Sequence, residues 1–312
     1  MRITVSLPER PDAWIAGLQR ELPGAVVEAW RPGAPPADHA VVWAPSQQFI
    51  DEQSPGLRGL FNIGAGVDAL LALRIPDSMR IVRLDDAGMS VQMAEYVCHA
   101  LIRHFREFDG YEADAGEGRW GFRRPRSRRD FPVGVMGLGV LGRRVAKAVA
   151  QFEFPVNGWS RTPREVEGVR TFSGAAGFED FLAASRVVVC LLPLTDDTRG
   201  ILRRETLEKL HGGAPGGYVI NVARGAHLVE DDLIPLLDGG RLAGATLDVF
   251  QTEPLPPDHP FWRHPKVTVT PHASARTLRD ESIVQIAAKI RAVEGGAGFD
   301  DLPGVVDGTR GY

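Results

Sequence analysis

The stretch FPVGVMGLGVLGRRVAKAVAQF, residues 131–152, decides the fold class of this chain. An apolar run is followed by the pattern GxGxxG, formed by Gly137, Gly139 and Gly142, and then by apolar residues at helical spacing. A strand before the pattern and a helix after it indicate a dinucleotide site, with a glycine-rich structural turn as the lesser alternative. The glycines permit a tight turn and close approach of a pyrophosphate, and the first helical residues, Val140 and Leu141, offer N–H groups to it.

Short apolar runs alternate with helical stretches on both sides of this loop. Upstream lie RITVSL, AVVEAW, AVVWAP, GLFNIGAG and RIVRLD, followed by an amphipathic stretch over residues 89–108. Downstream lie FPVNGWS, RVVVCLL, GYVINVA, GATLDVF and KVTVTPH. This alternation predicts parallel, doubly wound sheets with right-handed crossovers, the α/β class. A chain of 312 residues has room for two such domains, each with its own core.

Composition and charge argue against several classes of protein. Hydrophobic residues make up 44% and charged residues 24%, which is typical of globular proteins and not of disordered or fibrous ones. A net charge of -4 gives no basis for a nucleic-acid or membrane partner. The start MRITVSLPER has no apolar signal-peptide core, and no segment approaches the about 20 apolar residues of a membrane span. We therefore expect a soluble, cytoplasmic protein in which Cys98 and Cys190 are buried thiols, with a disulfide or catalytic thiol as the minority alternative.

The residues after the second strand of the downstream series bear on the choice of cofactor. In NAD-binding versions of the motif, an acidic residue about 20 positions after the glycines binds the adenosine ribose. Here the strand ends at Trp159 and is followed by Ser160, Arg161 and Thr162, without a carboxylate. A guanidinium between two hydroxyls suits a dianionic 2′-phosphate, which favours NADPH and leaves NADH as the weaker alternative. Arg161 stacked on adenine or facing water is the other interpretation.

Three reactive side chains follow late strands: Arg224 in NVARGAHL, Glu253 in QTEPLPPDHPFW and His272 in VTVTPHASA. Ligands of open parallel sheets bind outside the carboxyl ends of the strands, so these side chains are expected to converge. Reduction of a 2-oxo acid needs a cation for the substrate carboxylate and an acid for the carbonyl oxygen. Arginine and histidine supply both, and a dinucleotide supplies the hydride.

Other features are expected to be ordinary. No pair of histidines, and no histidine with a carboxylate, has the spacing of a metal site on a helix, and the GxSxG elbow of serine hydrolases does not occur, so neither chemistry is expected. The arginine-rich residues 119–129 are expected to form a solvated loop, with a subunit or phosphate contact as the alternative. The remaining histidines are expected to be packed or surface residues: His39, His99, His104, His211, His227, His259 and His264.

Taken together, the stretches resemble the D-isomer-specific 2-hydroxyacid dehydrogenase family, and within it the glyoxylate/hydroxypyruvate reductases. The matching stretches run nearly end to end: VVWAPS, NIGAGVD, RLDDAGMSVQMAEYV, VGVMGLGVLG, WSRTP, LLPLTDDTRGIL, VINVARGAHL, LDVFQTEPLPPDHPFWRHP, TPH and VDGTRGY. The resemblance implies that Arg224 binds the substrate carboxylate, that His272 is the general acid and that Glu253 orients it. It also implies substrate contacts at Trp43, Ala65 and Gly66, and cofactor contacts at Leu192, Pro193, Ala223 and Asp248. Arg276 stands where many members of the family carry a small or apolar residue, and is either a second substrate cation or a surface arginine.

The resemblance further implies two Rossmann-like, doubly wound, parallel-sheet domains, with the dinucleotide-binding domain (96–277) inserted into a substrate-binding domain (1–95 and 278–312). It implies a homodimer that uses the long helix containing MAEYV. The predicted activity is NADPH-preferring reduction of glyoxylate or hydroxypyruvate. The alternatives are a dehydrogenase of a larger 2-hydroxy acid, a nucleotide-sensing corepressor of the same fold and, least favoured, an enzyme of serine biosynthesis.

Overall fold

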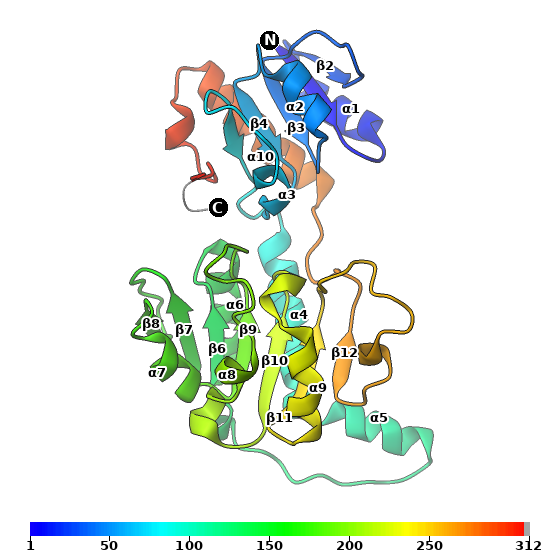
Figure 1. The fold of residues 1–312 in the computed structure, drawn as a ribbon, viewed down its shortest axis with the longest axis vertical. Coiled ribbons are helices and arrows are strands. Elements are labelled where there is room, and N and C mark those ends of the chain that lie inside the picture. The colour runs from blue at the N-terminus through cyan, green and yellow to red at the C-terminus, as the bar shows by residue number, and fades with distance from the viewer. Residues whose placement is uncertain (309–312) are drawn as a thin grey trace. The chain divides into compact units, whose positions relative to one another are not determined.

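The computed structural model describes residues 1–308, so the last four residues of VDGTRGY lie outside the described residues. The chain forms two compact units (Figure 1). The first unit combines Met1–Met89 with the chain from Thr277 onward, and the second is Ser90–Arg276. Each unit is built around one parallel sheet, so the α/β class predicted from the alternating runs is confirmed.

The first unit has a five-stranded parallel sheet in the order β2-β1-β3-β4-β5. Every residue of β3 and β4 is buried, as expected for central strands covered on both faces. The strands are β1 (Arg2–Ser6), β2 (Val26–Ala29), β3 (His39–Val42), β4 (Gly59–Asn62) and β5 (Arg80–Val82), and the helices are α1 (Pro11–Glu21), α2 (Gln47–Gln53), α3 (Asp68–Leu71) and α10 (Arg279–Glu294).

Both ends of the chain build this unit. Helix α10 packs against α1 so closely that a Cβ on Gly17 would lie 2.4 Å from Ile283 Cδ1. The chain after α10 then returns to the sheet, where Val305 forms an antiparallel bridge with Val82 of β5. Buried Lys289 of α10 pairs with Asp85, 2.9 Å away, just after β5. These contacts join residues that are 204–266 positions apart in the sequence.

The second unit has a seven-stranded parallel sheet in the order β12-β11-β10-β9-β6-β7-β8. From β6 the chain winds outward through β7 and β8, then crosses back to β9 and winds the other way. The strands are β6 (Val133–Met136), β7 (Val156–Ser160), β8 (Arg170–Ser173), β9 (Val187–Cys190), β10 (Gly217–Asn221), β11 (Leu242–Leu247) and β12 (Val267–Val269). The helices are α4 (Met89–Phe105), α5 (Phe108–Gly116), α6 (Val140–Gln151), α7 (Phe178–Ala183), α8 (Arg204–Leu207) and α9 (Glu230–Asp238).

Helices cover both faces of this sheet, because alternate residues of each strand face opposite sides. Val187 and Val189 of β9 join one apolar cluster with residues of α4 and α6, while Val188 and Cys190 join another with residues of α7 and α9. The winding is therefore double, as predicted. The long predicted helix ends at Phe105, and the chain turns at Glu107 (φ 54°) into α5.

Two smaller expectations concern cysteines and membranes. Cys98 and Cys190 are both buried free thiols, and burial raises the pKa of the Cys190 thiol to about 12, so neither a disulfide between them nor a reactive thiolate is supported. Among the described residues, no helix has the length and apolar character needed to cross a membrane.

Candidate active site

The glycine loop after β6 has the conformation that a dinucleotide pyrophosphate requires. Gly137 has a φ of +100°, which side-chain-bearing residues rarely adopt. A Cβ on Gly142 would lie 1.7 Å from the carbonyl oxygen of Gly137, so glycine is what allows α6 to pack on the loop. A Cβ on Gly139, in contrast, would meet no protein atom within 4 Å. Each of the three glycines thus serves a different purpose, and the space at Gly139 suits a closely approaching ligand.

The start of α6 completes this loop. The first helical hydrogen bond runs from Arg143 N to Gly139 O at 3.0 Å, so the N–H groups of Val140, Leu141 and Gly142 precede the helical ladder. Such N–H groups, at the positive end of a helix of twelve residues, favour an anion. The residues present therefore fit a bound dinucleotide.

The turn after β7 carries the residues predicted to bind the 2′-phosphate of the adenosine ribose. Ser160 is buried, and its hydroxyl donates to the carbonyl oxygen of Thr162 at 2.8 Å. Because a hydroxyl has one hydrogen, Ser160 can donate to a phosphate only by giving up this bond. The side chains of Arg161 and Thr162 are exposed. Ser160 therefore shapes the turn, and a cation and a second hydroxyl remain on its surface.

The predicted cofactor residues after β9 and β10 stand beside the glycine loop. Leu191 N donates to Met136 O at 2.9 Å, which continues the pairing of β6 and β9 by one residue and leads into Leu192 and Pro193. Ala223 follows β10, the neighbour of β9, and its N–H donates to the buried Asn221 side chain at 3.2 Å. The fold therefore brings these segments to the same edge of the sheet as Gly137.

Arg224 follows in an extended conformation after β10 (φ −142°, ψ 147°). Its Nη1 donates to the carbonyl oxygen of Ala223 at 2.7 Å, and its own carbonyl oxygen accepts from Asn221 Nδ2 at 3.0 Å. A fully buried histidine, His227, lies against the Arg224 backbone. His227 Nε2 is 3.2 Å from Pro193 O, and its Nδ1 is 3.2 Å from Arg224 N. A neutral ring with its proton on Nε2 satisfies both contacts and links the segments after β9 and β10.

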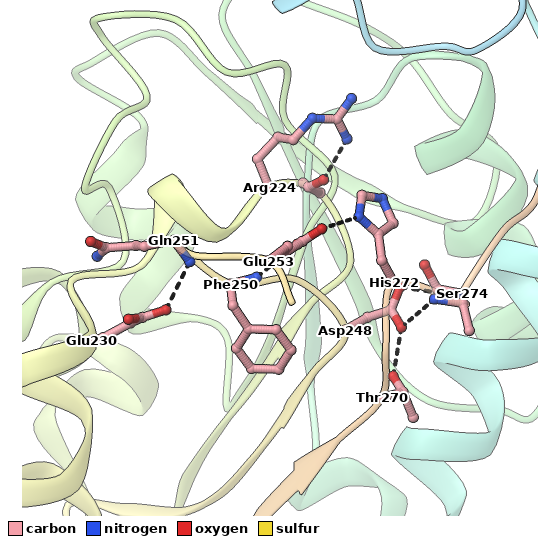
Figure 2. A network of polar contacts seen from close by, with 11 residues as sticks. Arg224, Glu230, Asp248, Phe250, Gln251, Glu253, Thr270, His272 and Ser274 are labelled. Carbon is pink, nitrogen blue, oxygen red and sulfur yellow. Dashed lines mark hydrogen bonds and ion pairs between the residues drawn. The ribbon is translucent and has the colours of Figure 1, made fainter. Parts of the chain in front are cut away.

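His272 and Glu253 form a pair (Figure 2). Nδ1 of His272 is 2.8 Å from Glu253 Oε2, and the other carboxylate oxygen accepts from Phe250 N at 3.0 Å. The ring nitrogen Nε2 then lies on the side of the ring away from Glu253. Both side chains are partly open to solvent, with 45% and 37% exposed. This is the arrangement of an acid–base histidine oriented by a carboxylate.

Gly225 sets the distance between the Arg224 and Glu253 segments. A Cβ on Gly225 would fall 1.8 Å from the carbonyl carbon of Phe250. The backbone after β10 therefore touches the backbone after β11, three residues before Glu253. In Figure 2 the side chains of Arg224, Glu253 and His272 gather above these two segments. The convergence predicted from strand ends is thus present within the second unit.

Asp248 lies buried beneath His272. Its carboxylate accepts hydrogen bonds from Thr270 Oγ1 (2.6 Å), Ala273 N (2.8 Å) and Ser274 N (2.8 Å). A carboxylate has about four acceptor positions, so three of them are taken by the chain itself. These three bonds fix the orientation of the Asp248 carboxylate.

The predicted substrate residues of the first unit form a cluster of their own. Trp43 follows β3, and its ring lies 2.4 Å from the position of a Cβ on Gly64. Buried Asn62 donates to the carbonyl oxygens of Gly64 (3.0 Å) and Gly66 (2.9 Å), which sets the shape of the loop that contains Ala65. In the second unit, the backbone of Arg276 is bonded to the side chain of Gln92 (3.2 and 2.9 Å), and its own side chain is exposed.

The sequence did not indicate the residues that hold the three predicted catalytic side chains in place. His227 was expected to be an ordinary packed histidine, and Asn221, Thr270 and Tyr96 were not singled out as polar contacts. The one available signal was the short spacing of Asn221 and His227 around Arg224. Among the described residues, no group of three or more histidine, cysteine or acidic side chains is placed to hold a metal ion.

The fold and this set of residues define a dinucleotide-dependent oxidoreductase, and comparison with known proteins names its family. A family model described as D-isomer specific 2-hydroxyacid dehydrogenase, NAD binding domain, matches residues 98–274. The chain belongs to the D-isomer specific 2-hydroxyacid dehydrogenase family. It is 46% identical over 308 residues to a glyoxylate/hydroxypyruvate reductase A of Serratia proteamaculans and 43% identical over 306 residues to one of Yersinia enterocolitica, with 96% of each chain covered in both comparisons.

Solved structures agree over the whole length. An NADPH-dependent glyoxylate/hydroxypyruvate reductase from Sinorhizobium meliloti, in complex with NADP and sulfate, has a TM-score of 0.91 and 37% identity, covering 100% of this chain and 99% of that chain. A D-isomer specific 2-hydroxyacid dehydrogenase from Xanthobacter autotrophicus Py2, in complex with NADPH and MES, has a TM-score of 0.91 and 39% identity, covering 99% of both.

The glycine loop generates a prediction that separates folding from binding. Gly142→Ala places a methyl group against Gly137 O, and we expect overpacking to cost about 1–3 kcal/mol of stability. Gly139→Ala has open space around it, so we expect an unchanged Tm but an affinity for nicotinamide dinucleotide about 10-fold lower or worse, or ~1.4 kcal/mol. Thermal unfolding and titration by protein fluorescence measure the two effects. Equal behaviour of the two variants in both assays would contradict the assigned roles.

Proposed function

We propose that this protein reduces a small 2-oxo acid, glyoxylate or hydroxypyruvate, to the corresponding 2-hydroxy acid, with NADPH as the preferred cofactor and NADH as a weaker one. The observation that carries the proposal is the His272–Glu253 pair, which lies with Arg224 at the same edge of the sheet as the glycine loop. The named activities of the Serratia, Yersinia and Sinorhizobium relatives support the substrate and the cofactor. A cytoplasmic location stays a prediction.

The chain's own groups account for substrate binding and for proton transfer. The Arg224 guanidinium, an always-charged planar fork, binds the substrate carboxylate. Glu253 accepts a hydrogen bond from Nδ1–H of His272 and so directs Nε2 toward the substrate. The Nε2 proton passes to the carbonyl oxygen as negative charge develops there. NADPH, when bound, would supply a hydride to the carbonyl carbon. The π bond of the carbonyl group breaks, its electron pair moves to the oxygen, and the oxygen takes the Nε2 proton to become the hydroxyl of the product. The assignment of Trp43, Ala65, Gly66 and Arg276 to substrate contacts remains a prediction from the resemblance.

The preference for NADPH rests on the turn after β7. The turn formed by Ser160, Arg161 and Thr162 contains one arginine and no carboxylate, so an anionic 2′-phosphate meets no like charge from this turn. Since the Ser160 hydroxyl is engaged with Thr162 O, we assign the phosphate contacts to Arg161 and to the Thr162 side chain. Leu192, Pro193, Ala223 and Asp248 are assigned to the nicotinamide half of the cofactor.

We also propose a homodimer. The apolar face of α4, the helix that contains MAEYV, packs inside the second unit. The chain after α5 instead carries Trp120 (102% exposed) and Phe122 (83% exposed). Asp114 holds this segment through ion pairs with Arg119 (2.8 Å) and Arg123 (2.7 Å). An ordered segment that presents two large apolar side chains to water is typical of a protein interface. The partner we propose is a second copy of this chain. The arginine-rich residues 119–129 would then contact the other subunit.

Turnover with purified protein tests the main proposal. We expect NADPH oxidation with glyoxylate or hydroxypyruvate. His272→Ala should lower kcat about 100-fold or more, the usual scale of general acid catalysis. Glu253→Gln removes the carboxylate that accepts from His272 Nδ1, so it should lower kcat in the same direction. Binding of NADPH without turnover of any 2-oxo acid would favour a corepressor-like module, and turnover only of bulky 2-oxo acids would contradict a small substrate.

Cofactor ratios test the role of Arg161. Arg161→Ala should lower kcat/KM for NADPH about 10- to 100-fold, because it removes one charge-assisted hydrogen bond to the phosphate. The value of kcat/KM for NADH should change little. Arg164→Ala, which removes an exposed arginine three residues further on, is the matched control and should change neither value. Equal losses with both cofactors would show that Arg161 contacts a part that they share. A wild-type preference for NADH would contradict the assignment outright.

Sedimentation tests the dimer. We expect the wild type to sediment as a dimer, and the double variant Trp120→Ser, Phe122→Ser to dissociate because it loses the apolar side chains proposed to lie at the interface. Trp262→Ser, at a half-exposed tryptophan of the same unit, is the control and should remain dimeric. A monomeric wild type, or a double variant that associates as tightly as the wild type, would contradict the proposal.

A further inference from the structure

His272 has a backbone conformation that needs outside support. Its φ of +50° lies in the left-handed region, which a residue with a side chain adopts at a cost in energy. The direction of the imidazole depends on this conformation, because the Cα–Cβ bond leaves a left-handed residue at a different angle from an extended one. Whatever holds this backbone therefore holds the ring against Glu253.

Asp248 holds it on three successive peptide groups. His272 N donates to the Asp248 carbonyl oxygen at 2.8 Å. Ala273 N donates to Asp248 Oδ1 and Ser274 N to Oδ2, each at 2.8 Å. Figure 2 shows the Asp248 carboxylate beneath His272 with its bonds to Ser274 and Thr270. The left-handed turn is thus fixed by one fully buried acidic residue.

The orientation of the Asp248 carboxylate depends in turn on two hydroxyls. Thr270 Oγ1 is 2.6 Å from Asp248 Oδ1, and the Tyr96 hydroxyl of α4 is 2.5 Å from Thr270 Oγ1. A carboxylate only accepts, so the single Thr270 hydrogen points at Asp248, and Thr270 must accept from Tyr96. Burial raises the pKa of Tyr96 to about 12, so the phenol keeps its hydrogen at working pH. Tyr96 of α4 therefore donates to Thr270, and Thr270 donates to Asp248, which supports the turn under His272.

We propose that Tyr96 and Thr270 are positioning residues for the reduction, which orient the His272 ring toward Glu253 through Asp248. The proposal rests on the proposed function, since it concerns the acid that this function requires. Neither side chain needs to touch the substrate. Their effect passes through hydrogen bonds of 2.5–2.8 Å, and small displacements of a catalytic group reduce the rate of the chemical step more than they reduce binding.

The chain offers a matched control in the same core. The hydroxyl of Tyr218 on β10 is 2.8 Å from Thr246 Oγ1 on β11, a second tyrosine–threonine pair, and this one is buried. In the described part of the chain, neither Tyr218 nor Thr246 forms a hydrogen bond with Asp248 or with residues 272–274. Tyr218→Phe therefore removes the same chemical group from a more deeply buried tyrosine without disturbing the support of His272.

The experiment compares Tyr96→Phe, Thr270→Val and Thr270→Ser with Tyr218→Phe. For Tyr96→Phe and Thr270→Val we expect kcat to fall about 10-fold with KM for NADPH within about twofold of wild type, the pattern of a misaligned catalytic group. The deuterium isotope effect on kcat with NADPD should rise, because the chemical step becomes slower relative to product release. Thr270→Ser keeps the hydroxyl and should restore the wild-type values, and Tyr218→Phe should keep them.

A second readout does not depend on turnover. The Nδ1 proton of His272, assigned by its loss in His272→Gln, reports the bond to Glu253 by NMR. We expect its signal to shift in Tyr96→Phe and to stay in place in Tyr218→Phe. The proposal would be overturned if Tyr96→Phe left the signal, kcat and the isotope effect unchanged. It would also be overturned if Tyr96→Phe and Tyr218→Phe changed them equally. A wild type without turnover whose signal still responds to Tyr96→Phe would instead refute the proposed function and leave the positioning role standing.

Discussion

The parallel register of the second sheet is the constraint on which the site depends. In successive pairings Met136 lies opposite Cys190, Cys190 opposite Asn221, Asn221 opposite Leu247 and Leu247 opposite Val269. The strands therefore end in one row across the sheet. The glycine loop, Arg224, Asp248 and His272 all follow this row within three residues. Because the strands are parallel, every one of these segments leaves the sheet at the same edge.

Close approach of backbones then turns a shared edge into a compact site. Gly142 allows α6 to rest on the carbonyl oxygen of Gly137, and Gly225 allows the chain after β10 to touch the chain after β11 at Phe250. At both places a single methyl group would hold the segments apart. The second contact matters as much as the first, because it brings the segment that carries Glu253 to the segment that carries Arg224.

Buried polar groups hold the individual side chains. Asn221 and His227 support the backbone around Arg224, and Asp248 supports the left-handed turn at His272. A buried polar group left without partners is costly, so each of these residues requires a defined arrangement of its neighbours. This requirement fixes the backbone segments that carry Arg224 and His272. Preorganisation of this kind is what general acid catalysis needs.

The amino-acid sequence alone determined the class of fold, the glycine loop and the three reactive side chains. Apolar periodicity, glycine at fixed spacing and the position of charged residues after strands are local properties, so they can be read without coordinates. The bond from Tyr96 to Thr270, the contact of His227 with Pro193 and the close approach at Gly225 were decided only by the tertiary structure. Their partners are 174, 34 and 25 residues apart, and no periodicity links them. Long-range partners depend on strand order and register, which follow from how the whole sheet packs.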